Sequence, residues 1–532
     1  MEVELCAETA RRWPRGDDPG TPPVGGPGRC TRWRRLGPLV AALGGLLLAG
    51  CQGVPAPRAD YLVIGIETAP TSLDPRTALD ATSAQVTDLV FRGLTRPGDD
   101  GGFVPDLADG WSHQGLEWTF HLRPARFHDG SPVRAADVVA TWRSLARAEM
   151  RGLRSSEWEP IASVDAPDEA TVRFVLREPH APFLASTTIG IVTERCAASG
   201  RDCDVGNGPF RFVARGVDTV TLAAAETADP RPSLPGIVLR ASPDGASRAL
   251  GLARGSIDLV QNAVEPELLP WLEGRGLSVA STPGSNFQYL GFNLDVPALR
   301  DPRVRRAIAS AIDVPAIIAG LLAGRARPAG ELLPPGHWAH AGRVPPTYDP
   351  ALARYLLDEA GVHGLRLQYK TTTVDLRRRM AEAIAGYLRA VGIDVEIRPL
   401  EWAALYGDVR RGNFELVSLA WVGISDPDLY YGWLHSSMRP PRGNNRGGYS
   451  NPLVDHLTSA ARAEDATDRR AALYRQVAAE TERDLPFVPL WWVDNTVVHT
   501  RRLVGFAPSP SGDLRGLVAA GWDGGPPPRG GS

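Results

Sequence analysis

The stretch from residue 365 to residue 399 constrains the fold more than any other part of the sequence. "LRLQYKT" (365–371) has the pattern of a strand, and "TVDLRRRMAEAIAGYLRAVG" (373–392) has that of a helix closed by Gly392. "IDVEIRP" (393–399) is a second strand, with its aliphatic side chains on one face. A strand, a crossover helix and a strand in this order form a βαβ unit. We therefore predict an α/β fold.

The length of the chain indicates more than one domain. A chain of 532 residues is too long for a single ordinary core. Hydrophobic residues make up 43% and charged residues 22%, the balance of a globular protein in water. The formal net charge of −3 gives no electrostatic footprint for nucleic acid, so we expect no nucleic-acid partner.

A small α+β unit is predicted at 105–205. "EWTFHLR" (117–123) and "TVRFVLR" (171–177) alternate apolar and polar residues, as half-buried strands do. "AADVVATWRSL" (135–145) lies between them and has the pattern of an amphipathic helix.

Two Asp-Pro pairs mark predicted helix starts in the second half. Asp301 is expected to be an N-cap with Pro302 at the first helical position. Val304, Ile308 and Ile312 would then form the buried stripe of that helix. The same start recurs at Asp349-Pro350.

The N-terminal region has the pattern of an export signal. Arginines precede an apolar run from Leu36 to Gly50, which is shorter than the roughly 20 residues that span a bilayer. The run ends in "LLAGC" (47–51), which resembles a bacterial lipobox. That resemblance implies cleavage before Cys51 and lipidation of its sulfur. The alternative is that Cys51 is an ordinary small residue. We expect residues 1–50 to be signal peptide and upstream extension, and 51–57 to be a lipidated tether.

The remaining cysteines suggest a disulfide. Cys6 and Cys30 would be lost with the signal peptide, which leaves Cys196 and Cys203. An even pair in an exported protein favours a bond that closes a small loop. Two free thiols are the alternative, and a metal site is weaker still, because no His or further Cys lies nearby at ligand spacing.

Six segments resemble the bacterial extracellular solute-binding proteins of family 5, the peptide- and nickel-binding subunits of ABC importers. They occur in family order between about residues 60 and 500. Any one of them is weak evidence, but six in order are strong. The segments are "TSLDPRTALDATSAQVTDLVFRGLTR", "FVPDLADGW", "FHLRPARFHDGSPVRAADVVATW", "GNGPFRF", "GFNLDVPALRDPRVRRAIASAID" and "NNRGGYSNPLVDHL".

The resemblance implies a two-lobed periplasmic-binding-protein fold with an extra subdomain and a ligand cleft between the lobes. The first lobe would comprise 58–104, 206–287 and 497–532. The inserted subdomain would be 105–205, and the second lobe 288–496, with the hinge at its termini. The family's mechanism is closure of the lobes on a ligand and docking on a membrane permease driven by an ATPase.

The resemblance also sets the expected partners. We expect an exported monomer, lipid-anchored on the periplasmic or cell-surface side, that binds a peptide or a peptide-like or opine-like small molecule. No cofactor and no metal site are expected. A nickel-chelate binder is an alternative ligand class, although His435 is the only histidine near the cleft segment. An exported hydrolase is the rival class, but the sequence has neither His-Glu-x-x-His nor Gly-x-Ser-x-Gly.

The candidate ligand contacts lie between residues 421 and 446. Aromatic residues suit a cleft that covers varied side chains, and we favour Trp421 for the site but core packing for Trp433 and Trp491. The guanidinium of Arg446, in the loop "GNNRGGY", could pair with a carboxylate or phosphate, or be solvated. The full set of candidate contacts is Trp421, Asp426, Tyr430, Asn445 and Arg446.

The segment "WVGISDPDLYYGW" (421–433) departs from the family. Peptide-binding relatives read approximately Trp-x-x-Asp-x-x-Asp-Pro, and the first acid pairs with the peptide's amino group. Here that position is Ile424, which cannot neutralise an ammonium group. Asp426 either takes over the role or caps a helix that starts at Pro427. Such a helix would favour an anionic ligand group, so we expect a ligand that does not rely on a free α-amine.

Overall fold

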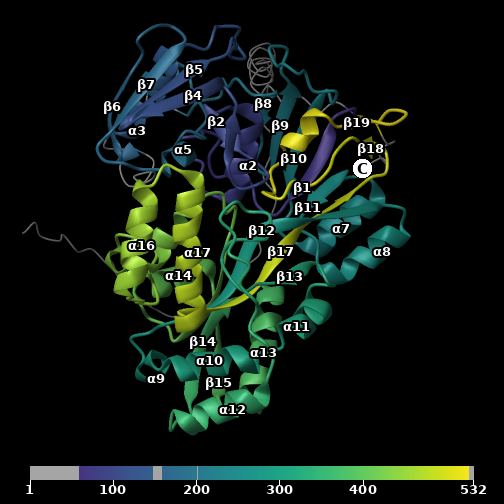
Figure 1. Ribbon diagram of the computed structural model, residues 1–532. Coiled ribbons are helices and arrows are strands. Elements are labelled where there is room, and N and C mark those ends of the chain that lie inside the picture. The colour runs from purple at the N-terminus through teal and green to yellow at the C-terminus, as the bar shows by residue number, and fades with distance from the viewer. Residues whose placement is uncertain (1–58, 148–157, 200–201, 527–532) are drawn as a thin grey trace, which may run out of the picture. The chain divides into compact units, whose positions relative to one another are not determined.

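The structure, a computed structural model, describes residues 59–147, 158–199 and 202–526 (Figure 1). All of them fall in one unit, Pro55–Ser532, which is described by itself. The predicted signal peptide and Cys51 lie outside the described residues. Within the described ranges, no helix is both long and apolar enough to cross a membrane.

A mixed sheet of eleven strands runs through this unit. In spatial order its path is β15 (Asp394–Leu400), β14 (Arg366–Thr372), β16 (Leu416–Trp421), β12 (Ser278–Phe292), β17 (Phe487–His499), β11 (Leu259–Gln261), β1 (Leu62–Ile66), β10 (Gly236–Ala241), β9 (Thr219–Ala224) and β8 (Phe210–Arg215), with β13 (Ala326–Pro328) paired to β17. The predicted α/β class is confirmed.

The long antiparallel strands β12 and β17 connect the two halves of the sheet. The first residues of β12 and the last residues of β17 pair beside β11, whereas the end of β12 pairs with β16. Figure 1 shows β12 and β17 side by side. Their register shifts between Thr282 and Asn286, so that Pro283–Ser285 bulges out of the ladder. This bulge lies where the chain passes from one half to the other.

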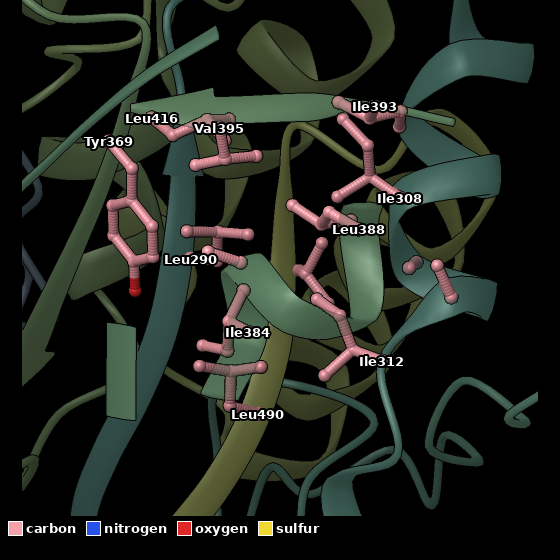
Figure 2. Packing of buried hydrophobic residues seen from close by; sticks show 14 of the residues in the cluster. Leu290, Ile308, Ile312, Tyr369, Ile384, Leu388, Ile393, Val395, Leu416 and Leu490 are labelled. Atoms are coloured by element: carbon pink, nitrogen blue, oxygen red, sulfur yellow. The ribbon is translucent and has the colours of Figure 1, made fainter. Parts of the chain in front are cut away.

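The predicted βαβ unit is confirmed. Strands β14 and β15 are parallel and joined by α13 (Asp375–Ala390). Gly392 follows with φ of +92°, a left-handed conformation that suits glycine after a helix. Figure 2 shows Ile384 and Leu388 of this helix packed with Leu290 and Leu490 of the long strands, so the crossover helix builds the core of this half.

Helix α10 (Pro302–Ala311) packs on the same core. Asp301 caps it by accepting a hydrogen bond from the backbone of Arg303, with Pro302 in its first turn, as predicted. Val304, Ile308 and Ile312 are buried. Asp349 caps α12 (Pro350–Glu359) in the same way, through the backbone N–H groups of Ala351 and Leu352.

The predicted α+β unit forms a separate antiparallel sheet, in the order β4 (Ala108–Gln114), β5 (Glu117–Leu122), β7 (Thr171–Leu176) and β6 (Ile161–Asp165). Helix α3 (Ala135–Leu145) packs on it, and Phe120, Phe174 and Phe183 meet in its core. A disulfide joins Cys196 and Cys203, whose Cα atoms are 5.9 Å apart. The proposed domain boundaries themselves stay a prediction.

The other elements complete the layers around the sheets. They are α2 (Ala81–Val90), β2 (Thr95–Pro97), β3 (Phe103–Pro105), α5 (Phe183–Ser186), α6 (Glu194–Ser199), α7 (Gly245–Arg254), α8 (Leu269–Gly274), α9 (Pro297–Arg300), α11 (Val314–Leu321), α14 (Trp402–Arg410), α15 (Leu429–Leu434), α16 (Pro452–Ala463), α17 (Thr467–Asp484), β18 (Leu503–Val504) and β19 (Gly521–Trp522), with short 3-10 turns at Pro266–Leu268, Ser436–Met438 and Arg515–Val518.

Candidate ligand cleft

A cavity of about 440 Å³ lies where the β12 bulge meets loops from both halves of the sheet. This volume is within the usual range for small-molecule sites. The lining is drawn from the start of α2, the β2–β3 turn, the bulge, and the segments 334–337, 422–425 and 510–515. Residues far apart in the sequence therefore share one wall.

Gly284 lets the bulge approach β17 closely. A Cβ atom at this position would lie 2.3 Å from the carbonyl oxygen of Val493. Any side chain would therefore push the two long strands apart. The neighbours Pro283 and Ser285 line the cavity, so the strand crossing also shapes the site.

Carboxylates outnumber cations in the cavity wall. The charged lining residues are Asp80, Asp88, Asp99 and Asp513 against Arg327 and Arg515, an excess of two negative charges. Asp88 pairs with Arg515 at 3.9 Å. Arg327 pairs with Asp494, which lies outside the lining, at 3.4 Å. The remaining imbalance favours a ligand with a cationic group.

Asp80 and Asp513 are held in place by neutral donors. Asp80 caps α2 and accepts hydrogen bonds from the backbone of Ser83 at 2.8 Å and from the hydroxyl of Thr71 at 2.5 Å. Burial alone would raise the pKa of Asp80, but the bonds from Ser83 and Thr71 outweigh it and lower the pKa. Asp513 accepts from the hydroxyl of Ser511 at 2.5 Å. No Lys, Arg or His among the described residues forms an ion pair with Asp80 or Asp513, so their charge is available to a ligand.

His337 supplies a neutral imidazole to the wall. Burial lowers its pKa to about 4, so the ring is uncharged at neutral pH. Its Nδ1 accepts from the backbone N–H of Ala339 at 3.1 Å, which places the ring proton on Nε2. The Nε2 edge of the ring lies against Gly101, where a Cβ atom would be 2.5 Å away.

The segment 421–433 contributes four consecutive residues to the cavity wall. Val422, Gly423, Ile424 and Ser425 line it, and Ile424 is buried. The departure from the family pattern therefore falls in the wall of the cavity.

Asp426 points away from this wall. Its carboxylate forms a two-pronged ion pair with Arg470, at 2.6 and 3.0 Å; Arg470 is buried, and the side chain of Asp426 is 10% exposed. Burial would lower the pKa of Arg470, but Asp426 outweighs it and raises the pKa. Asp426 does not line the cavity, and its role as a ligand contact stays a prediction.

The predicted helix start at Pro427 is wrong by two residues. Helix α15 spans Leu429–Leu434, and Asp428 precedes it. Asp426 accepts from the backbone N–H of Asp428 at 2.7 Å, so it closes the turn that leads into the helix. Because α15 has only six residues and the N–H of Asp428 is already bonded to Asp426, we do not expect an anionic ligand group to bind at this turn.

The other candidate contacts lie behind the cavity wall. Trp421 packs edge-to-face on Trp433 at 5.6 Å, and the guanidinium of Arg446 lies 5.6 Å from the centre of the Trp421 ring. Tyr430 is fully buried, and the amide of Asn445 bridges the backbone of His435 and Tyr449. These residues support the wall, and direct ligand contact stays a prediction for each.

Trp433 and Trp491 are buried in the core, as predicted. Sequence reasoning missed Asp80, His337 and Asp513. Asp80 had a visible sequence pattern, since it directly precedes a helical stretch, as an N-cap does. Within the described ranges, no group of three or more His, Cys, Asp and Glu side chains could hold a metal ion.

The family comparison agrees with the resemblance seen in the sequence. The model of the bacterial extracellular solute-binding proteins, family 5 Middle, matches residues 102–440, more than half of the chain. The "Dipeptide-binding protein" of Escherichia coli is 27% identical over 482 residues, which cover 81% of this chain and 89% of that protein. A "Probable D,D-dipeptide-binding periplasmic protein" of the same organism is 27% identical over 477 residues, 85% of this chain and 92% of the relative.

Solved structures show the same fold. A periplasmic binding protein of Helicobacter pylori in complex with the peptide STSA has a TM-score of 0.75 and 26% identity, covering 87% of this chain and 98% of that one. A Brucella suis protein in complex with Fe(III)-EDTA has a TM-score of 0.79 at 23% identity, covering 87% of this chain and 100% of that one. The two-lobed architecture expected from the sequence is confirmed.

Proposed function

Because the chain belongs to the bacterial extracellular solute-binding proteins of family 5, we propose that it captures a small peptide-like solute in the 440 Å³ cavity. It is an exported substrate-binding protein of an ABC transporter, and its partners are a membrane permease and its ATPase. Relatives that bind dipeptides or the peptide STSA support a peptide-like ligand for this chain.

The observation that carries the ligand class is the negative charge of the cavity wall. Asp80 and Asp513 are carboxylates with hydrogen bonds to neutral donors, in a wall with more aspartates than arginines. A primary ammonium group suits such a wall, since charge-assisted hydrogen bonds to carboxylates are the strong ones. The amine of the solute would then be held by Asp80 and Asp513, and Ile424 would only cover the apolar part. This proposal replaces the expectation drawn from Ile424 alone.

Calorimetry with trialanine and N-acetyl-trialanine tests this proposal. Acetylation removes the positive charge, so it should weaken binding by on the order of 100-fold, the scale of a lost buried ion pair of about 3 kcal/mol. Equal affinities would contradict a role for the amine.

A matched pair of variants locates the contact. Asp80→Asn keeps an N-cap residue of equal quality but removes the charge. It should weaken trialanine binding by about tenfold, the scale of a lost charge-assisted hydrogen bond. Asp244→Asn is the control, because Asp244 caps α7 through Ser247 in the same way and does not line the cavity. If both variants bind trialanine as the wild type does, Asp80 is not the amine partner.

Further parts of the proposal are that the chain is a lipid-anchored monomer through Cys51 and has no catalytic activity. Mass spectrometry of a peptide mixture incubated with the protein would reveal cleavage products if it were a hydrolase. A nickel-chelate ligand remains the alternative class, and mass spectrometry of solutes that co-purify with the protein would separate it from a peptide.

A further inference from the structure

A second cavity, of about 470 Å³, lies next to the cleft. It is lined by residues from the region of β2, the loops 123–126, 207–209 and 227–230, and the turn at Arg515–Val518. Its volume lies within the usual range for small-molecule sites, and none of the ligand contacts predicted from the sequence lines it.

Arginine dominates the wall of this second cavity. Five arginines face three aspartates, an excess of two positive charges. The lining arginines are Arg92, Arg96, Arg123, Arg126 and Arg515. The wall of the first cavity has an excess of two negative charges instead, so the net charges of the two walls are opposite in sign.

Arg96 and Arg126 keep most of their N–H donors available. Arg92 pairs with Asp106 at 2.7 Å, and Arg123 pairs with Asp109 at 3.3 Å. Among the described residues, Arg96 and Arg126 have no carboxylate within ion-pair distance. Arg126 donates to the carbonyl oxygen of Gly130 at 2.7 Å, and Arg96 makes only a long bond of 3.5 Å to the carbonyl oxygen of Pro97. Each guanidinium has five N–H donors in a fork that matches an oxyanion.

The two cavities adjoin each other. Asp88 and Arg515 line both of them and pair with each other at 3.9 Å. This long, partly exposed ion pair is the partition between the acidic and the basic cavity. A solute that reaches past the pair would meet carboxylates on one side and guanidinium groups on the other.

We propose that the arginine-lined cavity binds an oxyanion group, a carboxylate or a phosphate, of the solute whose body occupies the cleft. The inference rests on the proposed function for the identity of that solute. Arg96 and Arg126 supply the charge-assisted hydrogen bonds, and the cleft holds the cationic end of the same molecule. The binding site is thus matched to solutes with separated positive and negative charges.

Calorimetry on the purified protein with two free probes, glutarate and inorganic phosphate, tests the site itself. The wild type should bind at least one of them, and the preferred probe identifies the oxyanion as carboxylate or phosphate. The double variant Arg96→Gln/Arg126→Gln should weaken that binding by tenfold or more, the scale of a lost charge-assisted hydrogen bond. Arg254→Gln is the control, because it removes the same charge from the exposed end of α7, away from both cavities. Raised salt should weaken the binding as well.

A second measurement connects the site to the cleft. Trialanine should bind about tenfold more tightly than trialanine amide to the wild type, and with equal affinity to the double variant. If trialanine does not bind while a free oxyanion does, the peptide-like class is wrong and the arginine site stands. If trialanine binds but its amide binds equally well, the proposed function stands and the inference is overturned. The inference also fails if neither free probe binds, or if the double variant weakens binding no more than Arg254→Gln does.

Discussion

The ion pair between Asp426 and Arg470 involves the acid that the sequence suggested as a substitute partner for a ligand amine. The two residues are 44 positions apart in the sequence, and little of either side chain is exposed. The guanidinium also lies 5.4 Å from the centre of the Trp338 ring. The pair therefore fixes the turn before α15 to helix α17, behind the segment that lines the cleft.

Asp426→Ala is expected to destabilise the fold strongly. It leaves the guanidinium of Arg470 buried without its main partner, which costs on the order of 3–5 kcal/mol of unfolding free energy. Urea unfolding followed by tryptophan fluorescence measures the change, and Asp468→Ala on the exposed face of α17 is the control. Unchanged stability with lost binding of trialanine would instead make Asp426 a ligand contact.

Asp428 is predicted to make stability depend on pH. Burial raises its pKa to about 7, although Arg462 lies 3.2 Å away and opposes the shift. Between the unfolded pKa of 3.8 and about 7, the unfolded chain is ionised and the folded chain keeps the proton. This group therefore makes stability fall as pH rises through that window.

The variant Asp428→Asn carries an amide at every pH and should lack that contribution. The wild type should thus lose more stability than the variant between about pH 4 and about pH 8. Thermal melting at both pH values measures the difference. Parallel changes in the two proteins would show that Asp428 is ionised in the folded state across the whole range.

At the scale of elements, the bulge in β12 is the feature on which both the fold and the cleft depend. Pro283–Ser285 leave the β12–β17 ladder at this bulge and line the cavity.

Gly284→Ala should therefore separate β12 from β17 locally. The added methyl group would meet the carbonyl oxygen of Val493 at 2.3 Å, and backbone cannot yield as a flexible side chain can. We expect a loss of about 1–3 kcal/mol of unfolding free energy, typical of overpacking, together with weaker binding of trialanine. Gly274→Ala, at a position where an added Cβ meets nothing within 4 Å, is the control. Equal stability of both variants would contradict a tight crossing.

The disulfide joins Cys196 in α6 to Cys203, which lies between α6 and β8. Cys203 is buried, and its backbone N–H donates to Asp74 at 3.2 Å. Closing a loop of this size should stabilise the fold by on the order of 2–3 kcal/mol. Cys196→Ser/Cys203→Ser should therefore unfold at lower urea, and alkylation of the unreduced, denatured wild type should find neither thiol free. Two alkylated thiols would contradict the bond.

At the scale of the whole molecule, the sequence predicts a membrane anchor ahead of the binding unit. The lipobox-like "LLAGC" (47–51) lies shortly before the unit Pro55–Ser532 in the sequence. Lipidation at Cys51 would hold the binding unit at the membrane surface near its permease, provided that more than one acyl chain is attached.

Palmitate labelling tests the anchor. The wild type should incorporate label and move to the membrane fraction, whereas Cys51→Ala should do neither. Cys30→Ala serves as the control, since that cysteine lies upstream of the predicted cleavage site. Equal labelling of wild type and Cys51→Ala would exclude the lipobox interpretation.

The local elements follow from the sequence alone. The βαβ unit, the caps at Asp301 and Asp349 and the alternating strand at 117–122 follow from periodicity and from single residues at element ends. These patterns act over a few residues, so the chain around them is sufficient to define them. The two-lobed fold was predicted from the family resemblance and not from these local patterns.

Which side chains meet depends on how the chain folds in three dimensions. Asp80, His337 and Asp513 share one cavity wall because the crossing of β12 and β17 brings three distant segments together. Asp426 matches the Asp-Pro of the family pattern, yet its carboxylate pairs with Arg470. A buried guanidinium without a paired carboxylate would be costly. Charge balance in a cavity is a sum over distant segments, and no local pattern along the chain contains it.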